Sequence, residues 1–395
     1  MTGHVARDQA RDDARDSFVP FALVEWQSRH EPSAEYSLAD SGCRPARLVD
    51  VVADPDELQR LLAIEQGYGA IAGAGPLREL IAEWHRARAA DVLVTVGGTE
   101  ANAIVLDALV EPGGHAVVVE PGYPQLIGCL RNRGARVDTV ALDPARGWRL
   151  DAELLGRAVR PDTRVIVVTN PNNPTGAVLG DAEMASVVAA AERVGAWVLA
   201  DEVHRGTEVH GGGVTPTFWK RYDRVACVGS MSKAFGLPGL RIGWLVAPPE
   251  LRARAERRHE YATIAPAKLA SHLAERALTA PVRQRLLDRT HALLQAGRTA
   301  LRAWVDASEG LVSLIDPQAT AVGFVRYHRA QASLDVAEAL RSAGVLVIPG
   351  AHFGVEQHLR ITHAVELSYL TPALQRISSV LRGLAPMNPT SQTTR

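Results

Sequence analysis

The sequence has too few cysteines and too little net charge for several classes of protein. Its 395 residues include only Cys43, Cys129 and Cys227, which are widely spaced and form no CxxC pair. This pattern excludes a disulfide framework and a zinc site, so we expect no metal and a reducing compartment, the cytoplasm. The formal net charge of −1 gives no electrostatic reason to expect nucleic acid or a membrane as partner.

Long apolar runs, internal repeats and low-complexity segments are also missing. No run reaches transmembrane length, and the N-terminus, which is polar and mixed in charge, lacks the apolar core of a signal peptide. We expect residues 1–17 to be a flexible leader and residues 389–395 a flexible tail. The length suggests about two domains, and 47% hydrophobic with 22% charged residues is typical of a soluble globular protein.

Strand-like and helical stretches alternate in the first two thirds of the chain. Apolar strands separated by helices indicate an α/β fold with a mostly parallel seven-stranded sheet between helices. After about residue 255 the pattern changes to a smaller α+β domain. We therefore expect a large domain at 50–275 and a small one at 18–49 plus 276–388. The expected strands of the sheet are 92–96, 116–119, 136–140, 164–169, 197–200 and 225–228, with a return strand at 243–246.

One short stretch, residues 230–241, carries the strongest chemical signal. It follows a buried strand and reads Ser-Met-Ser-Lys-Ala-Phe-Gly-Leu-Pro-Gly-Leu-Arg. The amine of Lys233 is suited to an imine with a carbonyl compound such as the aldehyde of pyridoxal phosphate (PLP). The hydroxyls of Ser230 and Ser232 and the guanidinium of Arg241 would suit its phosphate. A surface lysine in a glycine-rich loop is the simpler alternative.

The other strand ends add residues that suit the same cofactor. Gly98 and Thr99 begin a helix whose N–H groups could approach a phosphate, and Tyr123 could stack on a flat ring. Asn173, in Asn-Pro-Asn-Asn-Pro-Thr-Gly, could donate to a phenolate oxygen, and one of its X-Pro bonds could be cis. Asp201 could keep a pyridine nitrogen protonated. Taken singly, a helix cap, a packed tyrosine, a turn or an ion pair would explain them.

Together, in this order and spacing, the motifs resemble those of the class I and II aminotransferases, which are PLP enzymes of fold type I. The resemblance covers roughly residues 35–385. It implies PLP as cofactor, a free α-amino acid as substrate and a 2-oxo acid as product. It implies that Lys233 forms the Schiff base and acts as base, with Asp201 and Tyr123 as further catalytic residues.

The resemblance implies further roles at matching positions. Tyr68, in Gly-Tyr-Gly, corresponds to a tyrosine that reaches the phosphate in the neighbouring subunit, which implies a homodimer with shared active sites. Arg360 corresponds to the arginine that holds the substrate carboxylate, and Gly42 to a region that lines the substrate pocket. Ser230 and Arg241 correspond to phosphate ligands.

Three departures from the family pattern leave the reaction type open. His204 stands where the family has a tyrosine that donates to the cofactor's phenolic oxygen. Residues 319–324 replace a Gly-Gly-x-Phe segment, and His363 replaces an aromatic residue.

A narrower resemblance, to capreomycidine synthase-like PLP enzymes, rests on Ser41-Gly42, residues 232–241 and the run from Gly344 to Gly354. It implies β-elimination and cyclisation of a hydroxylated arginine-like amino acid as the alternative to transamination. Glu31, Glu35 and Asp40 are candidates for holding a guanidinium, although solvated surface carboxylates would look the same. A DNA-binding regulator and a catalytically dead PLP-binding protein are disfavoured, because the match begins near residue 35 and Lys233 is present.

Overall fold

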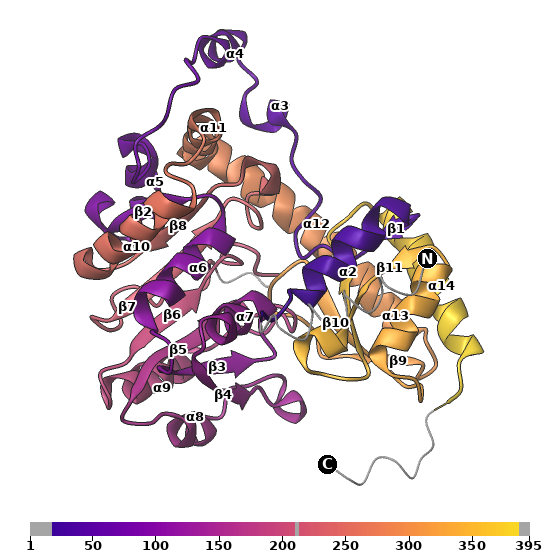
Figure 1. The fold of residues 1–395 in the computed structure, drawn as a ribbon. Helices are drawn as coiled ribbons and strands as arrows, with labels where there is room; N and C mark the ends of the chain where they lie inside the picture. The colour runs from indigo at the N-terminus through magenta and orange to yellow at the C-terminus, as the bar shows by residue number, and fades with distance from the viewer. Residues whose placement is uncertain (1–17, 210–212, 387–395) are drawn as a thin grey trace, which may run out of the picture.

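A computed structural model of the chain describes residues 18–209 and 213–386, and the ends expected to be flexible (1–17 and 389–395) lie outside these. Figure 1 shows two sheet-based regions side by side, the larger built on the first two thirds of the chain. No helix in the described part of the chain is both long and apolar enough to span a bilayer.

The larger region contains a seven-stranded sheet in the order β2-β8-β7-β6-β5-β3-β4. Every strand is parallel to the others except β8, which is antiparallel to both of its neighbours. The expected mostly parallel sheet of seven strands is therefore confirmed. The strands are β2 (Val92–Thr95), β3 (His115–Glu120), β4 (Arg136–Ala141), β5 (Thr163–Thr169), β6 (Trp197–Asp201), β7 (Val225–Ser230) and β8 (Gly243–Val246).

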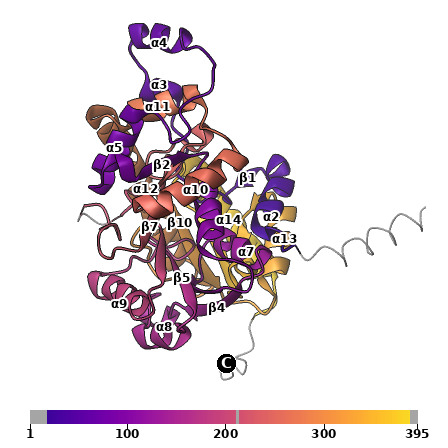
Figure 2. The ribbon, with the colours of Figure 1, turned by 60° about the vertical axis from the view of Figure 1, so that its left-hand side comes forward.

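Helices cover both faces of this sheet, as its nearly all-apolar central strands require (Figures 1 and 2). One face packs against α6 (Gly98–Leu109), α7 (Pro124–Asn132) and α10 (Pro249–Ala262). The other packs against α5 (Gly75–His85), α8 (Ala152–Ala158), α9 (Asp181–Glu192), α11 (Lys268–Leu278) and the start of α12 (Ala280–Asp306). The carboxyl ends of the parallel strands are thereby left open along one edge.

The smaller region is built on an antiparallel sheet in the order β12-β13-β10-β9. The apolar run at residues 345–349 forms two short strands, because residues 345–346 pair with β1 and residues 348–349 pair with β13. The elements are α2 (Ala22–His30), β1 (Tyr36–Ser37), β9 (Val312–Leu314), β10 (Val322–Tyr327), α13 (Ser333–Ser342), β11 (Val345–Leu346), β12 (Ile348–Pro349), β13 (His358–Thr362) and α14 (Leu367–Gly383).

A segment that we call the N-terminal strap, residues 38–46, joins the two regions. Its start is bonded to the smaller region, where Leu38 N donates to the Leu346 carbonyl. Its end is bonded to the loop after β7, where Ala46 N donates to the Gly236 carbonyl at 2.7 Å. The chain then forms α3 (Leu48–Val51) and α4 (Pro55–Leu62), which Figures 1 and 2 show standing away from the large sheet.

Five short 3-10 helices complete the elements of the described residues. They are η1 (Glu31–Ser33), η2 (Ala89–Asp91), η3 (Pro144–Arg146), η4 (Pro238–Leu240) and η5 (Gly350–Phe353).

Candidate active site

A cavity of about 150 Å³ lies at the carboxyl ends of the parallel strands. It brings together residues that are far apart in sequence and that come from β5, β6, α6 and the loops after β3 and β7. The sequence-derived candidates that line it are Gly98, Thr99, Tyr123, Asn173, Asp201, His204, Ser230, Ser232, Lys233 and Arg241. The lining residues to which the sequence analysis assigned no role in the site are Ser41, Asn102, Thr169, Val203 and Pro238.

Three candidates do not line this cavity. The side chain of Tyr68 is 85% exposed, well outside the site of its own chain. Gly42 lies against the catalytic loop, since a Cβ added to it would be 3.6 Å from the Ser232 carbonyl oxygen. Arg360 is buried behind Asn173, which does line the cavity.

Lys233 lies in the loop after β7, and its amine meets the N-terminal strap. Lys233 Nζ donates a hydrogen bond of 2.8 Å to Ser41 Oγ and lies 3.5 Å from Asp40 Oδ1. The strap thus places a hydroxyl and a carboxylate beside the amine expected to do the chemistry. This contact spans 192 positions of sequence, so no local pattern could have revealed it.

Asp201 ends β6 with its carboxylate fully buried beside the cavity. Asn102 Nδ2 donates to Asp201 Oδ2 at 2.8 Å, and Val203 N donates to Asp201 Oδ1 at 3.2 Å. Burial raises the pKa of the Asp201 carboxyl, against the lowering effect of these donors and of Lys233. Asn102 is four residues after Gly98 on α6, and that spacing, which places both on one helix face, was the signal that could have found it.

The N-terminus of α6 forms an open cradle. Its cap residue, Gly97, provides no side-chain cap, so N–H groups of the first turn are left for a ligand. Close packing keeps the cradle narrow: a Cβ on Gly97 would lie 2.5 Å from Arg241 Nη2, and one on Gly243 would lie 2.3 Å from the Gly97 carbonyl carbon. Arg241 and the paired hydroxyls of Ser230 and Ser232, 2.8 Å apart, complete an anion-binding set.

His204 and Tyr123 line the cavity from the loops that follow β6 and β3. His204 is 1% exposed, and its Nδ1 has no hydrogen-bond partner within the described chain. Burial, with the nearby Lys233 and Arg360 charges, holds the pKa of His204 well below its usual value, so the ring is neutral. Burial and then the Asp201 carboxylate raise the pKa of the Tyr123 phenol. Phe21, just before α2, packs edge-on against Tyr123 with ring centroids 5.6 Å apart.

Arg360 lies on β13 and reaches from the smaller region toward the cavity. Its Nη1 donates to Asn173 Oδ1 at 3.2 Å, its Nη2 donates to the Ala39 carbonyl, and Phe353 lies under the guanidinium. Burial lowers the pKa of Arg360 to about 10, so it remains a cation. Its Nε has no partner in the described residues, which leaves a buried donor beside the cavity for an anionic ligand.

Two of the three acidic candidates near the early turn have partners elsewhere. Glu35 forms an ion pair with Arg376 on the surface, and Glu31 accepts a hydrogen bond from Ser37 Oγ at 2.8 Å. Only Asp40 contacts a residue of the cavity lining. The replaced 319–324 segment is tied to the loop after β6, because Thr320 N donates to the Thr207 carbonyl at 3.1 Å.

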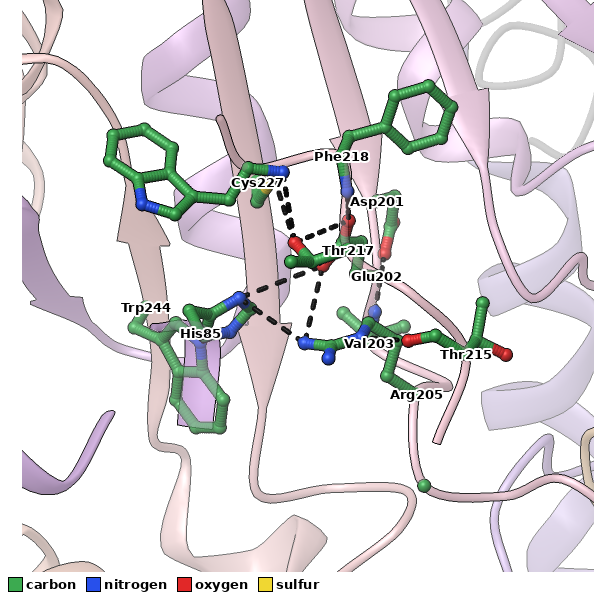
Figure 3. A network of polar contacts seen from close by, with 12 residues as sticks. His85, Asp201, Glu202, Val203, Arg205, Thr215, Thr217, Phe218, Cys227 and Trp244 are labelled. Carbon is green, nitrogen blue, oxygen red and sulfur yellow. Dashed lines mark hydrogen bonds and ion pairs between the residues drawn. The ribbon is translucent and has the colours of Figure 1, made fainter. Parts of the chain in front are cut away.

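Behind the cavity, Glu202 is the centre of a second polar cluster (Figure 3). Thr217 Oγ1 and Phe218 N donate to its carboxylate at 2.8 and 2.7 Å, and Arg205 Nη1 lies 3.5 Å away. His85 Nδ1 lies 3.7 Å from the carboxylate, and the other nitrogen of its ring accepts from Trp244 Nε1 at 2.9 Å. The Glu202 cluster is thus bonded internally and presents none of these groups to the cavity.

Comparison with known proteins identifies the family. The family model described as "Aminotransferase class I and II" matches residues 56–377. The chain belongs to this family. Capreomycidine synthase of Streptomyces vinaceus is 32% identical over 299 residues, which cover 73% of this chain and 74% of that protein. The resemblance expected from the motifs is confirmed.

Solved structures give the same fold. A PLP-dependent aminotransferase from Streptococcus suis 89-1591 superimposes with a TM-score of 0.87 and 31% identity, covering 94% of this chain and 100% of that one. The PLP-dependent cyclase OrfR superimposes with a TM-score of 0.83 and 27% identity, covering 92% and 97%. Both aminotransferases and a cyclase therefore share this architecture.

As a class I and II aminotransferase, the chain is a PLP enzyme, and its own residues fit that cofactor. The uncapped α6 N-terminus with Arg241 suits a phosphate, and the buried Asp201 carboxylate suits a pyridine nitrogen. The orphaned Nδ1 of His204 is a buried polar atom that lacks a partner in the described residues. An amine, Lys233, opens on the same cavity.

Proposed function

We propose that this chain is a PLP-dependent aminotransferase that converts a free α-amino acid into a 2-oxo acid. One observation carries the proposal. Lys233 and Arg360, the groups suited to the reacting amine and to the substrate carboxylate, come from different regions of the fold and converge around Ser41, Ala39 and Asn173. The N-terminal strap thus contacts both of the side chains that would bind an α-amino acid, Lys233 through Ser41 and Arg360 through Ala39.

The residues have distinct proposed roles in this reaction. Bound PLP supplies an electron sink and an aldehyde for the amino group. Lys233 would hold the cofactor and would then serve as the base for the Cα proton. Asp201 would keep the ring nitrogen protonated, and Ser230, Ser232, Arg241 and the start of α6 would hold the phosphate.

On the substrate side, Arg360 binds the carboxylate. Its planar charged fork and its unpartnered Nε suit that group. Tyr123 would cover the ring, and Asn173 and the neutral His204 would contact the phenolic oxygen, since all three line the cavity.

Elimination and cyclisation of a hydroxylated arginine-like substrate is the second candidate. It is favoured by the similarity to capreomycidine synthase over 73% of this chain and by the likeness to the cyclase OrfR. The same proton abstraction by Lys233 would begin either reaction, and a leaving group on Cβ would then depart.

We also propose that the enzyme is a cytoplasmic homodimer with shared active sites. The support is a set of exposed apolar side chains on α4, which stands away from the large sheet, and at the end of α10, which packs against that sheet. Tyr68 follows α4 in the chain and is exposed, so it would be free to reach a second subunit. The exposed members are Leu58, Leu62, Tyr68, Tyr261 and Ile264, with exposures from 44 to 95%.

The two sheets support the proposed division into a large domain (50–275) and a small one (18–49 plus 276–388). The long helix α12 begins just after the proposed boundary and contributes Leu286 to the large core and Leu301 to the small one. It would act as the connecting element.

Substrate screening with product analysis tests the proposed reaction. Purified protein loaded with PLP would be mixed with single amino acids, including arginine and 3-hydroxyarginine, and its absorbance and products followed. A 2-oxo acid with conversion of the cofactor to its amine form supports transamination. A cyclic product with unchanged cofactor would establish the second candidate instead.

Lys233→Ala is the decisive variant under either reading, and we expect it to abolish turnover. Lys268→Ala, on the surface of α11, is the matched control and should leave turnover unchanged. Turnover by Lys233→Ala at more than a few per cent of the native rate would refute the assignment.

A further inference from the structure

The amine of Lys233 has two partners that the roles above do not use. Ser41 Oγ accepts its hydrogen bond at 2.8 Å, and Asp40 Oδ1 lies 3.5 Å away. Asp40 Oδ1 also accepts from the backbone N–H groups of Ser41 and Gly42, at 2.5 and 3.1 Å. A short turn therefore fixes the carboxylate relative to the hydroxyl, and both face the same nitrogen.

The strap that carries these two residues is fixed from both regions of the molecule. Thr362 Oγ1 and Arg360 Nη2 bond the carbonyls of Asp40 and Ala39, and Thr362 N donates to the Leu38 carbonyl at 2.9 Å. These bonds hold the backbone of the strap, so the side chains of Asp40 and Ser41 remain available to contact Lys233. The fold therefore fixes where these two side chains lie relative to the amine.

Among the described residues that act on Lys233, Asp40 is the ionised acid that has no other role in the proposed reaction. Although burial opposes it, the Lys233 charge and the Gly42 N–H hold the pKa of the Asp40 carboxyl below its usual value. The carboxylate of Asp201 is assigned to the ring nitrogen. The remaining titratable or charged groups that act on Lys233 or Asp40 are His204, Cys43 and Arg360.

Those three groups do not supply a negative charge. His204 is neutral, and burial raises the pKa of the Cys43 thiol to about 12, so it stays protonated. Arg360 is a cation that the substrate carboxylate would neutralise. Once a substrate is bound, Asp40 is the anion left to stabilise positive charge on Lys233.

We propose that Asp40 and Ser41 form a proton-holding pair for Lys233, in which Ser41 orients the amine and Asp40 stabilises it when it carries the proton taken from the substrate. The inference rests on the proposed function, because it assumes that Lys233 is the base. Charge that develops on the amine in the transition state is met by a carboxylate already in place, which lowers the barrier.

The proton and electron balance of this step is simple. The Cα–H bond breaks, its electron pair remains with the carbon and the electron sink, and an N–H bond forms at Lys233 Nζ. The resulting ammonium donates to Ser41 Oγ and forms an ion pair with Asp40. The same proton later returns to carbon, so the step needs no co-reactant.

Asp40→Asn and Ser41→Ala, each loaded with PLP, test the proposal, with Glu35→Gln as the matched control. Glu35 belongs to the same N-terminal segment but pairs with Arg376 at the surface. The first readout is the pH midpoint of the cofactor's absorbance change in the resting enzyme, which needs no turnover. The second is the rate at which an amino acid substrate exchanges its Cα proton for deuterium in heavy water, followed by NMR.

For Asp40→Asn we expect the midpoint to fall by about one pH unit, since an opposite charge within reach of a cation raises its pKa by about 1–3 units and Asp40 is partly exposed. We expect Cα exchange to slow about tenfold. Ser41→Ala should slow exchange with a smaller shift of the midpoint. The Glu35→Gln control should leave both values unchanged.

Results that contradict the proton-holding pair differ from results that contradict the proposed aminotransferase function. An unchanged midpoint and exchange rate in an Asp40→Asn enzyme that loads PLP would overturn the proton-holding pair. So would an Asp40→Asn enzyme that only binds cationic amino acids more weakly, because Asp40 would then recognise the substrate's side chain. A native enzyme that shows no absorbance change with PLP would instead refute the proposed function.

Discussion

Asp201 and Glu202 are neighbours in sequence, both carboxylates and both buried, yet their surroundings are opposite (Figure 3). Glu202 has a full set of partners, with donors from Thr217 and Phe218 and a cation from Arg205. Asp201 has an amide and a backbone N–H but no cation within ion-pair distance among the described residues. The contrast indicates that Glu202 stabilises the fold, whereas the carboxylate of Asp201 is available to bind a ligand in the cavity.

Three polar atoms beside the cavity, His204 Nδ1, Asn102 Oδ1 and Arg360 Nε, lack partners among the described residues. The Glu202 cluster has one as well, Thr215 Oγ1, in the residue whose carbonyl accepts from Arg205 Nε. A buried polar group without a partner costs about 1–3 kcal/mol, so a ligand that bonded the three atoms beside the cavity would remove that cost there.

The largest expected effect is that of Asp201→Asn on activity. The amide cannot keep the ring nitrogen protonated, so we expect kcat/KM to fall about 10³-fold, within the range of lost acid–base catalysis. The unfolding free energy of the cofactor-free protein should not fall, because a costly buried charge is removed. Steady-state kinetics and urea unfolding measure the two effects.

The difference in unfolding free energy between Asp201→Asn and the native protein should depend on pH. The pKa of Asp201 is raised in the folded state, so the native protein binds the proton more tightly than the unfolded one. The native protein therefore loses stability as the pH rises above the carboxyl's unfolded pKa. Asp201→Asn should become relatively more stable over the same range. Activity within tenfold of native would show that Asp201 does not face the ring.

Glu202→Gln should have the opposite outcome. It leaves the buried Arg205 without its carboxylate, so we expect the unfolding free energy to fall by about 3 kcal/mol. The protein that remains folded should bind PLP with native absorbance and keep kcat within a few-fold. Glu192→Gln, on the exposed face of α9, is the control. If Glu202→Gln lost activity without losing stability, the two carboxylates would not differ as described.

The smallest expected effect concerns His363, a buried polar side chain outside both clusters. Neither ring nitrogen has a partner in the described residues, and burial lowers its pKa to about 4. The unfolded chain therefore takes up the proton first, and stability is lost as the pH falls below about 6.5. His363→Leu should raise the unfolding free energy by about 1–3 kcal/mol and flatten this acid dependence.

Urea unfolding at several pH values measures that change, with His272→Leu on the exposed surface of α11 as the control. An acid dependence as steep in His363→Leu as in the native protein would show that another group causes it.

The fold could be predicted largely from local pattern. The apolar runs of β5 and β7 are buried on both faces, and that is what a central parallel strand requires. The confirmed family and sheet follow from these runs and from the polar motifs at their ends. The split of residues 345–349 into two strands could not be predicted, because it depends on which distant partner each half meets.

Some residues of the candidate site could likewise be predicted from local pattern, and others could not. Side chains at the ends of strands, such as Asn173 and Asp201, lie where the strand-end argument placed them. The contact of Ser41 and Asp40 with Lys233 could not be predicted from the strand ends. It forms only because the N-terminal strap is bonded to both regions of the fold. Glu31 and Glu35 were equally plausible in sequence, and only the surface partners of each remove them from the site.

The measurement that tests the central claim most directly is chemical trapping of the cofactor. The chain has three lysines, Lys220, Lys233 and Lys268. Loading with PLP, reduction with borohydride, digestion and mass spectrometry would locate the covalently held group. We predict the added mass on Lys233 alone. Its appearance on Lys220 or Lys268, or on no lysine of a loaded enzyme, would contradict the account.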